Sequence, residues 1–366
     1  MIQIDFVRLR VLGLTPALAQ SAILVAEPDD PLSVDDLLLM RLIEVHRETV
    51  RVHDGEHEHG VRVLPRLLRE LTQAGTALAV GDWVLCGTDA YGDYRVHARV
   101  PPLASICRRD ADGRRHPVVS NVDTALLVMG LDDDFNPRRL ERYLALVQAS
   151  GVLPVVVLTK ADVAAHTPGL IEARIEALRG RLPAHVELLA VDGTDPATAR
   201  RLSAWLAPGQ TVVLLGSSGA GKSTLTNNLL GTETQDTGAV RAHDSRGKHT
   251  TTSRSLHRLP GGACVIDTPG LRTLRPDADE ATLAAVFEDV EALAAQCRFR
   301  DCRHADEPGC AVRDGIGADR LRNFQKLLRE ARRDTLTMLE KQQQMAVWKQ
   351  RGKAARVRAK FERGQP

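Results

Sequence analysis

The sequence lacks any apolar run that approaches the roughly 20 residues a membrane-spanning helix requires. It also lacks a basic N-terminal region followed by an apolar stretch, which is the pattern of a secretory signal. We therefore expect no membrane partner and a reducing, cytoplasmic setting. Neither sign of charge is in excess, because 49 Lys and Arg residues stand against 47 Asp and Glu residues, with a formal net charge of +2. The overall charge therefore favours no particular class of partner.

Cysteine is also scarce, with six residues in a chain of 366. In a reducing setting these residues do not form a disulfide framework, and clustered ones become candidates for metal binding. The composition is otherwise ordinary for a globular protein, with 43% hydrophobic and 26% charged residues. A chain of this length is too long for one small core, so we expect two or three domains.

A glycine-rich stretch at residues 216–224 has the spacing GxxxxGK[ST] of a phosphate-binding loop. The apolar run 211–215 precedes it, and a helical pattern with Leu225, Leu229 and Leu230 follows it. Strand, glycine loop and helix in this order predict binding of a nucleoside triphosphate. The loop consists of Gly216, Ser217, Ser218, Gly219, Ala220, Gly221, Lys222, Ser223 and Thr224.

The residue types of this loop suit a bound polyphosphate. Glycines let the backbone curl so that its N–H groups face an anion, and the following helix adds a positive dipole end. We expect Lys222 to reach the β- and γ-phosphates during catalysis, and the Ser223 hydroxyl to hold Mg²⁺.

Strands and helices alternate on both sides of this loop. Continuous apolar runs predict strands, helical periodicity predicts the helices between them, and this alternation favours a parallel sheet covered on both faces. We expect this α/β domain to span residues 113–275. The predicted strands are 122–129, 152–158, 186–191 and 211–215, and the predicted helices are 137–150, 169–182 and 195–206.

The strand 152–158 runs into T-K-A-D, which resembles the guanine-recognition element N/T-K-x-D of GTPases. The Asp162 carboxylate is suited to accept hydrogen bonds from N1–H and the exocyclic amine of guanine, a donor pair that adenine lacks. The Lys160 stem is suited to lie along the base. Thr159 replaces the commoner Asn and offers fewer hydrogen bonds, so base affinity is expected to be modest. The alternative is an ordinary solvated strand end.

Two further segments follow the phosphate loop. The polar stretch 247–252, G-K-H-T-T-T, offers Thr251 as a Mg²⁺ ligand, and the alternative is a mobile surface loop. The apolar run 263–266 leads into D-T-P-G, where Asp267 fits a carboxylate on the Mg²⁺ side and the Gly270 N–H fits a γ-phosphate contact.

The N-terminal third is patterned differently. Residues 1–37 form a weakly patterned extension in which Ile2, Ile4 and Phe6 alternate as in a short strand. Residues 38–112 contain short β-like runs that predict a small barrel or sandwich, of which an OB-like barrel is one form. His57 and His59 are two apart, but a solvated hairpin tip is favoured over a metal site. Residues 108–115 are expected to be a linker. The predicted strands are 44–52, 61–64, 83–86 and 94–100.

The C-terminal region carries a second candidate site. Cys297, Cys302, His304 and Cys310 fit a closed, tetrahedral, structural Zn²⁺ site, and their neighbours are too polar for a core. We place this site in a helical domain at 276–348, with helices at 279–296 and 317–345. The remaining cysteines, Cys86, Cys107 and Cys264, are expected in cores. The tail 349–366 is strongly basic, which fits either a solvated extension or binding of a phosphate backbone.

The order of these motifs is unusual. Ordinary GTPases place the phosphate loop first and the base-recognition element last, whereas here T-K-A-D comes first. With the barrel before it and the cysteine cluster after it, the chain resembles the circularly permuted GTPases of the ribosome small-subunit-dependent GTPase A family over roughly residues 40 to 320. Asn121-Val122-Asp123 matches that family near the domain start.

The resemblance implies a GTPase that binds the small ribosomal subunit and assists its late maturation, with GTP hydrolysis stimulated by the subunit. The expected architecture is an N-terminal OB-like β-barrel, a permuted α/β P-loop GTPase domain and a C-terminal α-helical zinc-binding domain. The expected partners are GTP or GDP, the small ribosomal subunit and its rRNA, with the chain a monomer. Leu271 stands where many GTPases have a Gln that orients the attacking water. The resemblance implies that His249 takes this role. The alternative is that His249 is a loop histidine with no catalytic role. The alternatives are an RNA-binding module without obligatory turnover, and an ATP-dependent enzyme, against which Asp162 argues.

Overall fold

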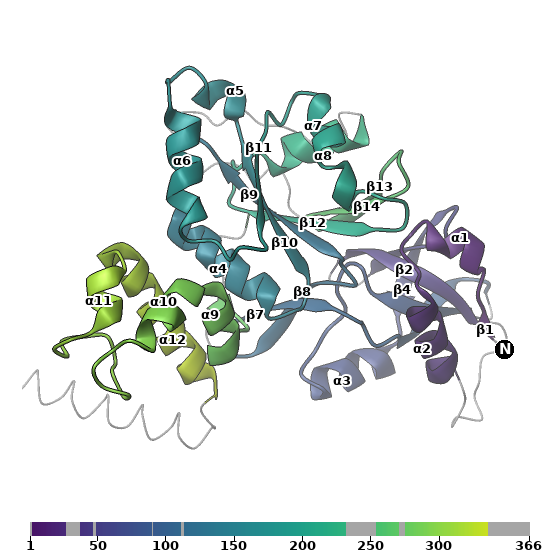
Figure 1. Cartoon of the computed structure of the whole chain (residues 1–366). Coiled ribbons are helices and arrows are strands. Elements are labelled where there is room, and N and C mark those ends of the chain that lie inside the picture. The colour runs from purple at the N-terminus through teal and green to yellow at the C-terminus, as the bar shows by residue number, and fades with distance from the viewer. Residues whose placement is uncertain are drawn as a thin grey trace, which may run out of the picture.

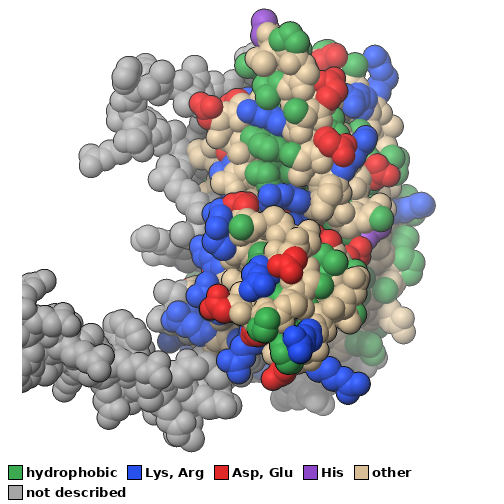
Figure 2. All heavy atoms as spheres, turned by 60° about the vertical axis from the view of Figure 1, so that its left-hand side comes forward, with side chains coloured by type: hydrophobic (Ala, Val, Ile, Leu, Met, Phe, Trp, Pro, Cys, Tyr) green, Lys and Arg blue, Asp and Glu red, His purple; other side chains and the backbone are tan. Residues whose placement is uncertain are grey.

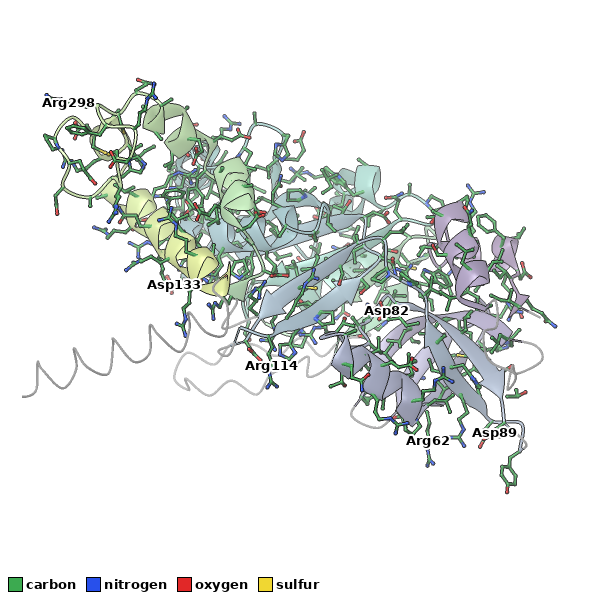
Figure 3. The ribbon with its side chains drawn as sticks, turned by 90° about the horizontal axis from the view of Figure 1, so that it is seen from below. Arg62, Asp82, Asp89, Arg114, Asp133 and Arg298 are labelled. Atoms are coloured by element: carbon green, nitrogen blue, oxygen red, sulfur yellow. The ribbon has the colours of Figure 1, made fainter. Side chains whose placement is uncertain are left out.

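The computed structural model describes residues 2–26, 37–46, 49–89, 91–110, 113–231, 254–270 and 275–335. Figure 1 shows a barrel, a central α/β domain and a group of C-terminal helices, arranged along an elongated molecule. Figure 3 shows Arg62 and Asp89 at the barrel end of the molecule and Arg298 at the opposite end. Within the described ranges, no helix has the length and apolar character needed to cross a membrane.

The barrel has five strands in the order β2-β3-β4-β6-β5 and closes because β5 also pairs with β2. Helix α3 (Pro65–Gln73) lies between β4 and β5, as in an OB-fold, so the predicted OB-like barrel is confirmed. The predicted strand 44–52 is wrong, because those residues span the turn between β2 and β3. The strands are β2 (Leu37–Val45), β3 (Val50–His53), β4 (Glu58–Val63), β5 (Trp83–Thr88) and β6 (Tyr94–Arg99).

The N-terminal segment is mostly helical, whereas its sequence predicted only a weakly patterned extension with a short strand. The alternation that predicted a strand reaches only β1 (Ile2–Gln3), because the Asp5 side chain accepts a hydrogen bond from the Arg8 N–H and caps α1 (Phe6–Arg10). Helix α2 (Pro16–Ala26) follows. The hairpin between β3 and β4 turns at Asp54, whose carboxylate accepts from the backbone N–H groups of Glu56 and His57.

The central sheet has both faces buried. Strands β9 (Thr124–Gly130), β10 (Leu153–Thr159), β11 (Glu187–Ala190), β12 (Thr211–Gly216) and β14 (Cys264–Asp267) pair in parallel, and β13 (Ser255–Arg258) is antiparallel, in the order β11-β10-β9-β12-β14-β13. Successive residues of β9 enter different hydrophobic clusters, with Leu127 on one face and Leu126 on the other. This alternation explains the continuous apolar runs in the sequence.

Helices cover the two faces of this sheet (Figure 1). Leu140 and Leu178 join the cluster on one face, and Leu202 and Leu225 join the cluster on the other. The helices are α4 (Pro137–Gln148), α5 (Ala161–Ala164), α6 (Leu170–Arg179), α7 (Ala197–Arg201) and α8 (Lys222–Leu230), with a 3-10 turn at Ser203–Trp205.

The predicted linker at 108–115 is wrong. Strands β7 (Ser105–Arg109) and β8 (Arg115–Ser120) form a hairpin there, and β15 (Arg275–Pro276) adds a third strand. Asp277 pairs with Arg109 at 2.6 Å and with Arg115 at 2.6 Å, which fixes the hairpin against a distant segment. Such long-range contacts leave little local pattern in a polar sequence.

The C-terminal part contains α9 (Glu280–Val286), α10 (Glu288–Ala294), α11 (Ala311–Gly315) and α12 (Ala318–Thr335). The predicted single helix 279–296 is wrong, because Phe287 breaks it with φ −115° and ψ 50°. The Phe287 ring is fully buried and packs against Phe324 with centroids 5.2 Å apart, so tertiary packing overrides helix propensity here. The predicted helix 317–345 corresponds to α12 as far as Thr335. Residues 336–345 of that prediction and the tail 349–366 lie outside the described residues.

A buried charge cluster attaches this part to the α/β domain. Glu141 on α4 is 1% exposed and accepts from Arg320 on α12 at 2.6 Å and from Arg181 at 3.2 Å. Arg320 also pairs with Asp289 of α10 at 2.7 Å. The buried carboxylate is therefore compensated, and three helices meet around it.

Candidate nucleotide site and metal centre

The phosphate-binding loop connects β12 to α8 as the sequence predicts. Gly219 and Gly221 have φ of 81° and 87°, a left-handed conformation that glycine adopts without strain. A Cβ atom at Gly216 would lie 2.4 Å from the Val128 carbonyl oxygen, so the start of the loop also requires glycine. The loop is thus held in a curled conformation, and Ser223 and Thr224 lie in the first turn of α8.

Lys222 points into this curl. Its side chain is largely buried, and its Nζ donates to the carbonyl oxygens of Gly216 at 3.2 Å and Ser217 at 2.7 Å. Burial lowers the pKa of Lys222, while the nearby Asp267 and Asp134 carboxylates oppose that shift. The ammonium group is therefore positioned by backbone carbonyls at the mouth of the loop.

Asp267 lies at the end of β14, next to the phosphate-binding loop. Its side chain is fully buried, its Oδ2 accepts from the Ser223 hydroxyl at 3.4 Å, and burial raises its pKa. A Cβ at Gly270 would lie 2.4 Å from the Ser218 nitrogen, so the D-T-P-G backbone packs directly on the phosphate-binding loop. A carboxylate and a hydroxyl converge here, which is an oxygen donor set that Mg²⁺ prefers.

The T-K-A-D segment is joined to the same loop. The buried Thr159 hydroxyl donates to the Ala220 carbonyl at 2.6 Å. Lys160 has φ 62°, and its Nζ pairs with Asp132 at 2.6 Å. Asp162 lies in the first turn of α5 with its side chain exposed. The structure thus brings the T-K-A-D segment to the edge of the sheet where the phosphate-binding loop lies.

A third loop, after β11, completes this edge. The Ala161 N–H donates to the Val191 carbonyl at 3.2 Å, and Asn228 of α8 donates to the carbonyls of Gly193 at 3.0 Å and Asp195 at 2.8 Å. Segments 159–162, 191–195 and 216–231 are therefore bonded to one another. His249 and Thr251 lie outside the described residues.

Asp134 contacts the phosphate-binding loop and was not among the predicted site residues. Its Oδ1 accepts from the Ser217 hydroxyl at 2.5 Å, and its Oδ2 accepts from the Gly130 N–H at 3.1 Å. Arg139 of α4 also binds the Asp134 carboxylate. Three consecutive aspartates directly after an apolar strand were the available signal, since strand ends of a parallel sheet commonly carry site residues.

The candidate metal centre has the geometry of a tetrahedral zinc site. Cys297 Sγ and Cys310 Sγ are 4.0 Å apart, and His304 Nδ1 lies 3.7 Å from the first sulfur and 3.5 Å from the second. All four candidate ligand atoms, including that of Cys302, lie within 4.8 Å of one another. Tetrahedral Zn²⁺ separates two thiolate sulfurs by about 3.8 Å, and a sulfur and an imidazole nitrogen by about 3.6 Å. The cluster therefore fits zinc.

Neighbouring backbone supports this cluster. The N–H groups of Val312 and Ala311 lower the pKa of Cys297 and so favour its thiolate form. Gln325 of α12 donates to the His304 carbonyl at 2.9 Å, which holds the metal loop on the long helix. The other cysteines, Cys86, Cys107 and Cys264, are buried as expected.

Comparison with known proteins shows where this arrangement occurs. Residues 100–276 match the family model described as RsgA GTPase. A protein of Xanthomonas oryzae pv. oryzae named "Small ribosomal subunit biogenesis GTPase RsgA" is 49% identical over 295 residues, which cover 78% of this chain and 79% of that protein. The chain belongs to the RsgA GTPase family. Its membership makes it a GTP-hydrolysing enzyme and confirms the resemblance found in the sequence.

Other matches agree with this membership. A protein of the same name from Xanthomonas axonopodis pv. citri is 48% identical over 298 residues, covering 79% of this chain and 80% of that protein. Residues 211–343 also match a family model described as 50S ribosome-binding GTPase. That match begins at β12, the strand that precedes the phosphate loop.

Solved structures show the same fold. The crystal structure of YjeQ from Thermotoga maritima superposes with a TM-score of 0.56 and 21% identity, covering 80% of this chain and 98% of that one. YloQ, described as a circularly permuted GTPase, superposes with a TM-score of 0.53 and 22% identity, covering 82% of this chain and 97% of that one. The RsgA-family fold with permuted motif order is thus confirmed, because β9, β10 and β11 precede β12 in the chain yet lie beside it in one sheet.

Proposed function

We propose that this RsgA-family GTPase binds the small ribosomal subunit, assists its late maturation, and hydrolyses GTP to GDP and phosphate faster when the subunit is bound. The proposal is supported by the names of relatives that are about half identical over most of the chain. It is also supported by the convergence of T-K-A-D, the phosphate-binding loop and D-T-P-G on one sheet edge.

In the proposed enzyme, residues 216–224 hold the phosphates through their N–H groups and through Lys222. Ser223 and Asp267, together with Thr251, would hold Mg²⁺, and the Gly270 N–H would contact the γ-phosphate. The bound ion would neutralise charge that develops on the phosphate oxygens. Two observations support these roles: the burial of Asp267 and the 3.4 Å contact of its carboxylate with Ser223.

Guanine recognition is proposed for Thr159, Lys160 and Asp162. The exposed carboxylate of Asp162 would accept from the base, and Thr159 would position the segment through its bond to Ala220. His249 is proposed to orient the attacking water as a neutral imidazole. Leu271, following Gly270, offers no polar group for that task.

We further propose one structural Zn²⁺ per chain on Cys297, Cys302, His304 and Cys310, with no open position for chemistry. The chain would act as a monomer in the cytoplasm, and rRNA would be its contact on the subunit. The sulfur–nitrogen distances support the zinc assignment, and the relatives' names support the location.

The test is phosphate release from GTP and from ATP, with and without purified small subunits. We expect the protein to hydrolyse GTP but not ATP, and the rate of GTP hydrolysis to rise clearly when subunits are added. Equal rates with and without subunits would contradict the ribosomal role, and would favour an RNA-binding module whose nucleotide site is structural. Equal rates with ATP would contradict guanine recognition by Asp162.

A further inference from the structure

The groove between α4 and α12 gathers cationic side chains from two parts of the molecule. Six Lys and Arg side chains and three amides line a hollow of about 430 Å³. Figure 2 shows Lys and Arg side chains concentrated on the face where the C-terminal helices adjoin the α/β domain. Among the described residues, the lining contains no carboxylate and no aromatic ring. It consists of Asn136, Arg138, Arg139, Arg142, Arg322, Asn323, Gln325, Lys326 and Arg329.

The charge of this basic groove is only partly compensated. Three carboxylates at its margin accept from four of the cations, and two cations remain. Lys326 and Arg329 are exposed, and neither has a carboxylate within 4.0 Å in the part of the chain that the structure describes. A net positive charge therefore faces solvent. The ion pairs are Arg142–Glu330, Arg138–Asp319, Arg322–Asp319 and Arg139–Asp134.

The spacing of the cations suits a strand of phosphates more than one small anion. Arg322, Lys326 and Arg329 follow one face of α12 at intervals of four and three residues, a row about 10 Å long at 1.5 Å per residue. Arg138 and Arg142 lie one turn apart on α4 and line the groove from that helix. Arginine forks are suited to phosphate oxygens, and without aromatic rings the groove offers no platform for stacked bases.

We propose that the basic groove between α4 and α12 binds the sugar-phosphate backbone of RNA, independently of base sequence. The proposal rests on the proposed function, since the small subunit supplies the RNA. It goes beyond that function by placing a contact at the junction of the α/β domain and the C-terminal helices. A strand lying there would contact both walls at once.

One residue links this groove to the nucleotide site. Arg139 lines the groove and binds the Asp134 carboxylate. Asp134 in turn accepts a hydrogen bond from the Ser217 hydroxyl of the phosphate-binding loop. An RNA phosphate in the groove would compete with Asp134 for the same guanidinium. RNA binding would thereby alter the support of the phosphate-binding loop, which provides a physical route from RNA contact to hydrolysis.

The experiment compares the wild type with Lys326→Gln/Arg329→Gln. The matched control is Arg179→Gln/Arg200→Gln, which removes the same charge from exposed positions on α6 and α7. Binding is measured to purified small subunits and to a mixed-sequence single-stranded RNA of about 20 nucleotides, from about 50 to about 200 mM salt. GTP hydrolysis is measured in parallel, both without and with subunits.

We expect the groove variant to bind RNA and subunits roughly tenfold more weakly at low salt, with the slope of log K against log salt reduced by about 1.4, because each lost contact removes about 0.7. Intrinsic hydrolysis and the control variant should match the wild type. A salt slope equal to that of the wild type would overturn the proposal. So would displacement of the RNA by equimolar inorganic phosphate, which would indicate a small-anion site. Failure of the ribosomal role is distinguishable, because the wild type itself would then show no stimulation by subunits.

Discussion

The nucleotide site and the metal centre are constructed in opposite ways. The proposed nucleotide site joins loops after β10, β11, β12 and β14, so its parts are separated by up to about a hundred residues and meet only because the strands are neighbours. The metal centre takes all its candidate ligands from residues 297–310. A dispersed site depends on the whole sheet, whereas a local site depends on one loop and its ion. The two should therefore respond differently to substitution.

The largest expected effect is on the local site. Cys310→Ala removes a fully buried candidate ligand, and three ligands hold structural zinc far more weakly than four. We expect zinc content to fall from about one per chain to near zero, with loss of amide protection over 297–315 and retention of protection in β9 and β12. Metal analysis and hydrogen exchange measure this. Cys107→Ala, at a buried cysteine outside the cluster, is the control, and should keep its zinc.

Lys222→Ala tests the dispersed site next. Losing the buried ammonium should slow GTP hydrolysis by about 100- to 1000-fold, the usual result of removing one preorganised charge at a transition state. Zinc content should not change, since the two sites share no residue. Phosphate release and metal analysis on the same preparation check both points. A variant with wild-type turnover would remove Lys222 from catalysis.

The same contrast between a local site and a dispersed site explains how much of each could be predicted from the sequence. The metal cluster and the phosphate-binding loop were predictable, because their spacing is local and each residue type has few alternative uses. The placement of Thr159 against Ala220 was predictable only through the rule that parallel strands end at one edge. Asp134 was missed, because the run of three aspartates marks a strand end but does not show which of them bonds to a loop 83 residues away.

The errors in the fold have the same origin. The hairpin β7–β8 depends on Asp277, which lies 168 residues from Arg109, and the break at Phe287 depends on its packing against Phe324. Local propensity favoured a linker in the first case and a continuous helix in the second. Tertiary contacts decided both, and a single sequence does not show such contacts.

A smaller effect is expected at the buried charge cluster that joins the α/β domain to the C-terminal helices. Glu141→Gln removes a buried charge that compensates Arg320 and Arg181, and breaking such a pair should cost about 3 kcal/mol. Urea unfolding followed in the presence of zinc measures the loss. Glu176→Gln on α6 is the control, because that side chain is 78% exposed and should change stability by less than about 0.5 kcal/mol. Equal stability of both variants would mean that the buried charge of Glu141 does not help to hold the helices together.

The smallest expected effect concerns one hydrogen bond between the proposed base-recognition segment and the phosphate-binding loop. Thr159→Val keeps the side chain's shape but removes the hydroxyl that donates 2.6 Å to the Ala220 carbonyl, which leaves a buried acceptor unpaired at about 1 to 2 kcal/mol. Because the bond joins two segments of one nucleotide site, GDP affinity should fall about tenfold, while zinc content stays constant. Calorimetric titration with GDP measures this. Thr282→Val, whose hydroxyl bonds an exposed carboxylate, is the control. If Thr159→Val bound GDP as the wild type does, the bond between Thr159 and Ala220 would not contribute to positioning the two segments for the nucleotide.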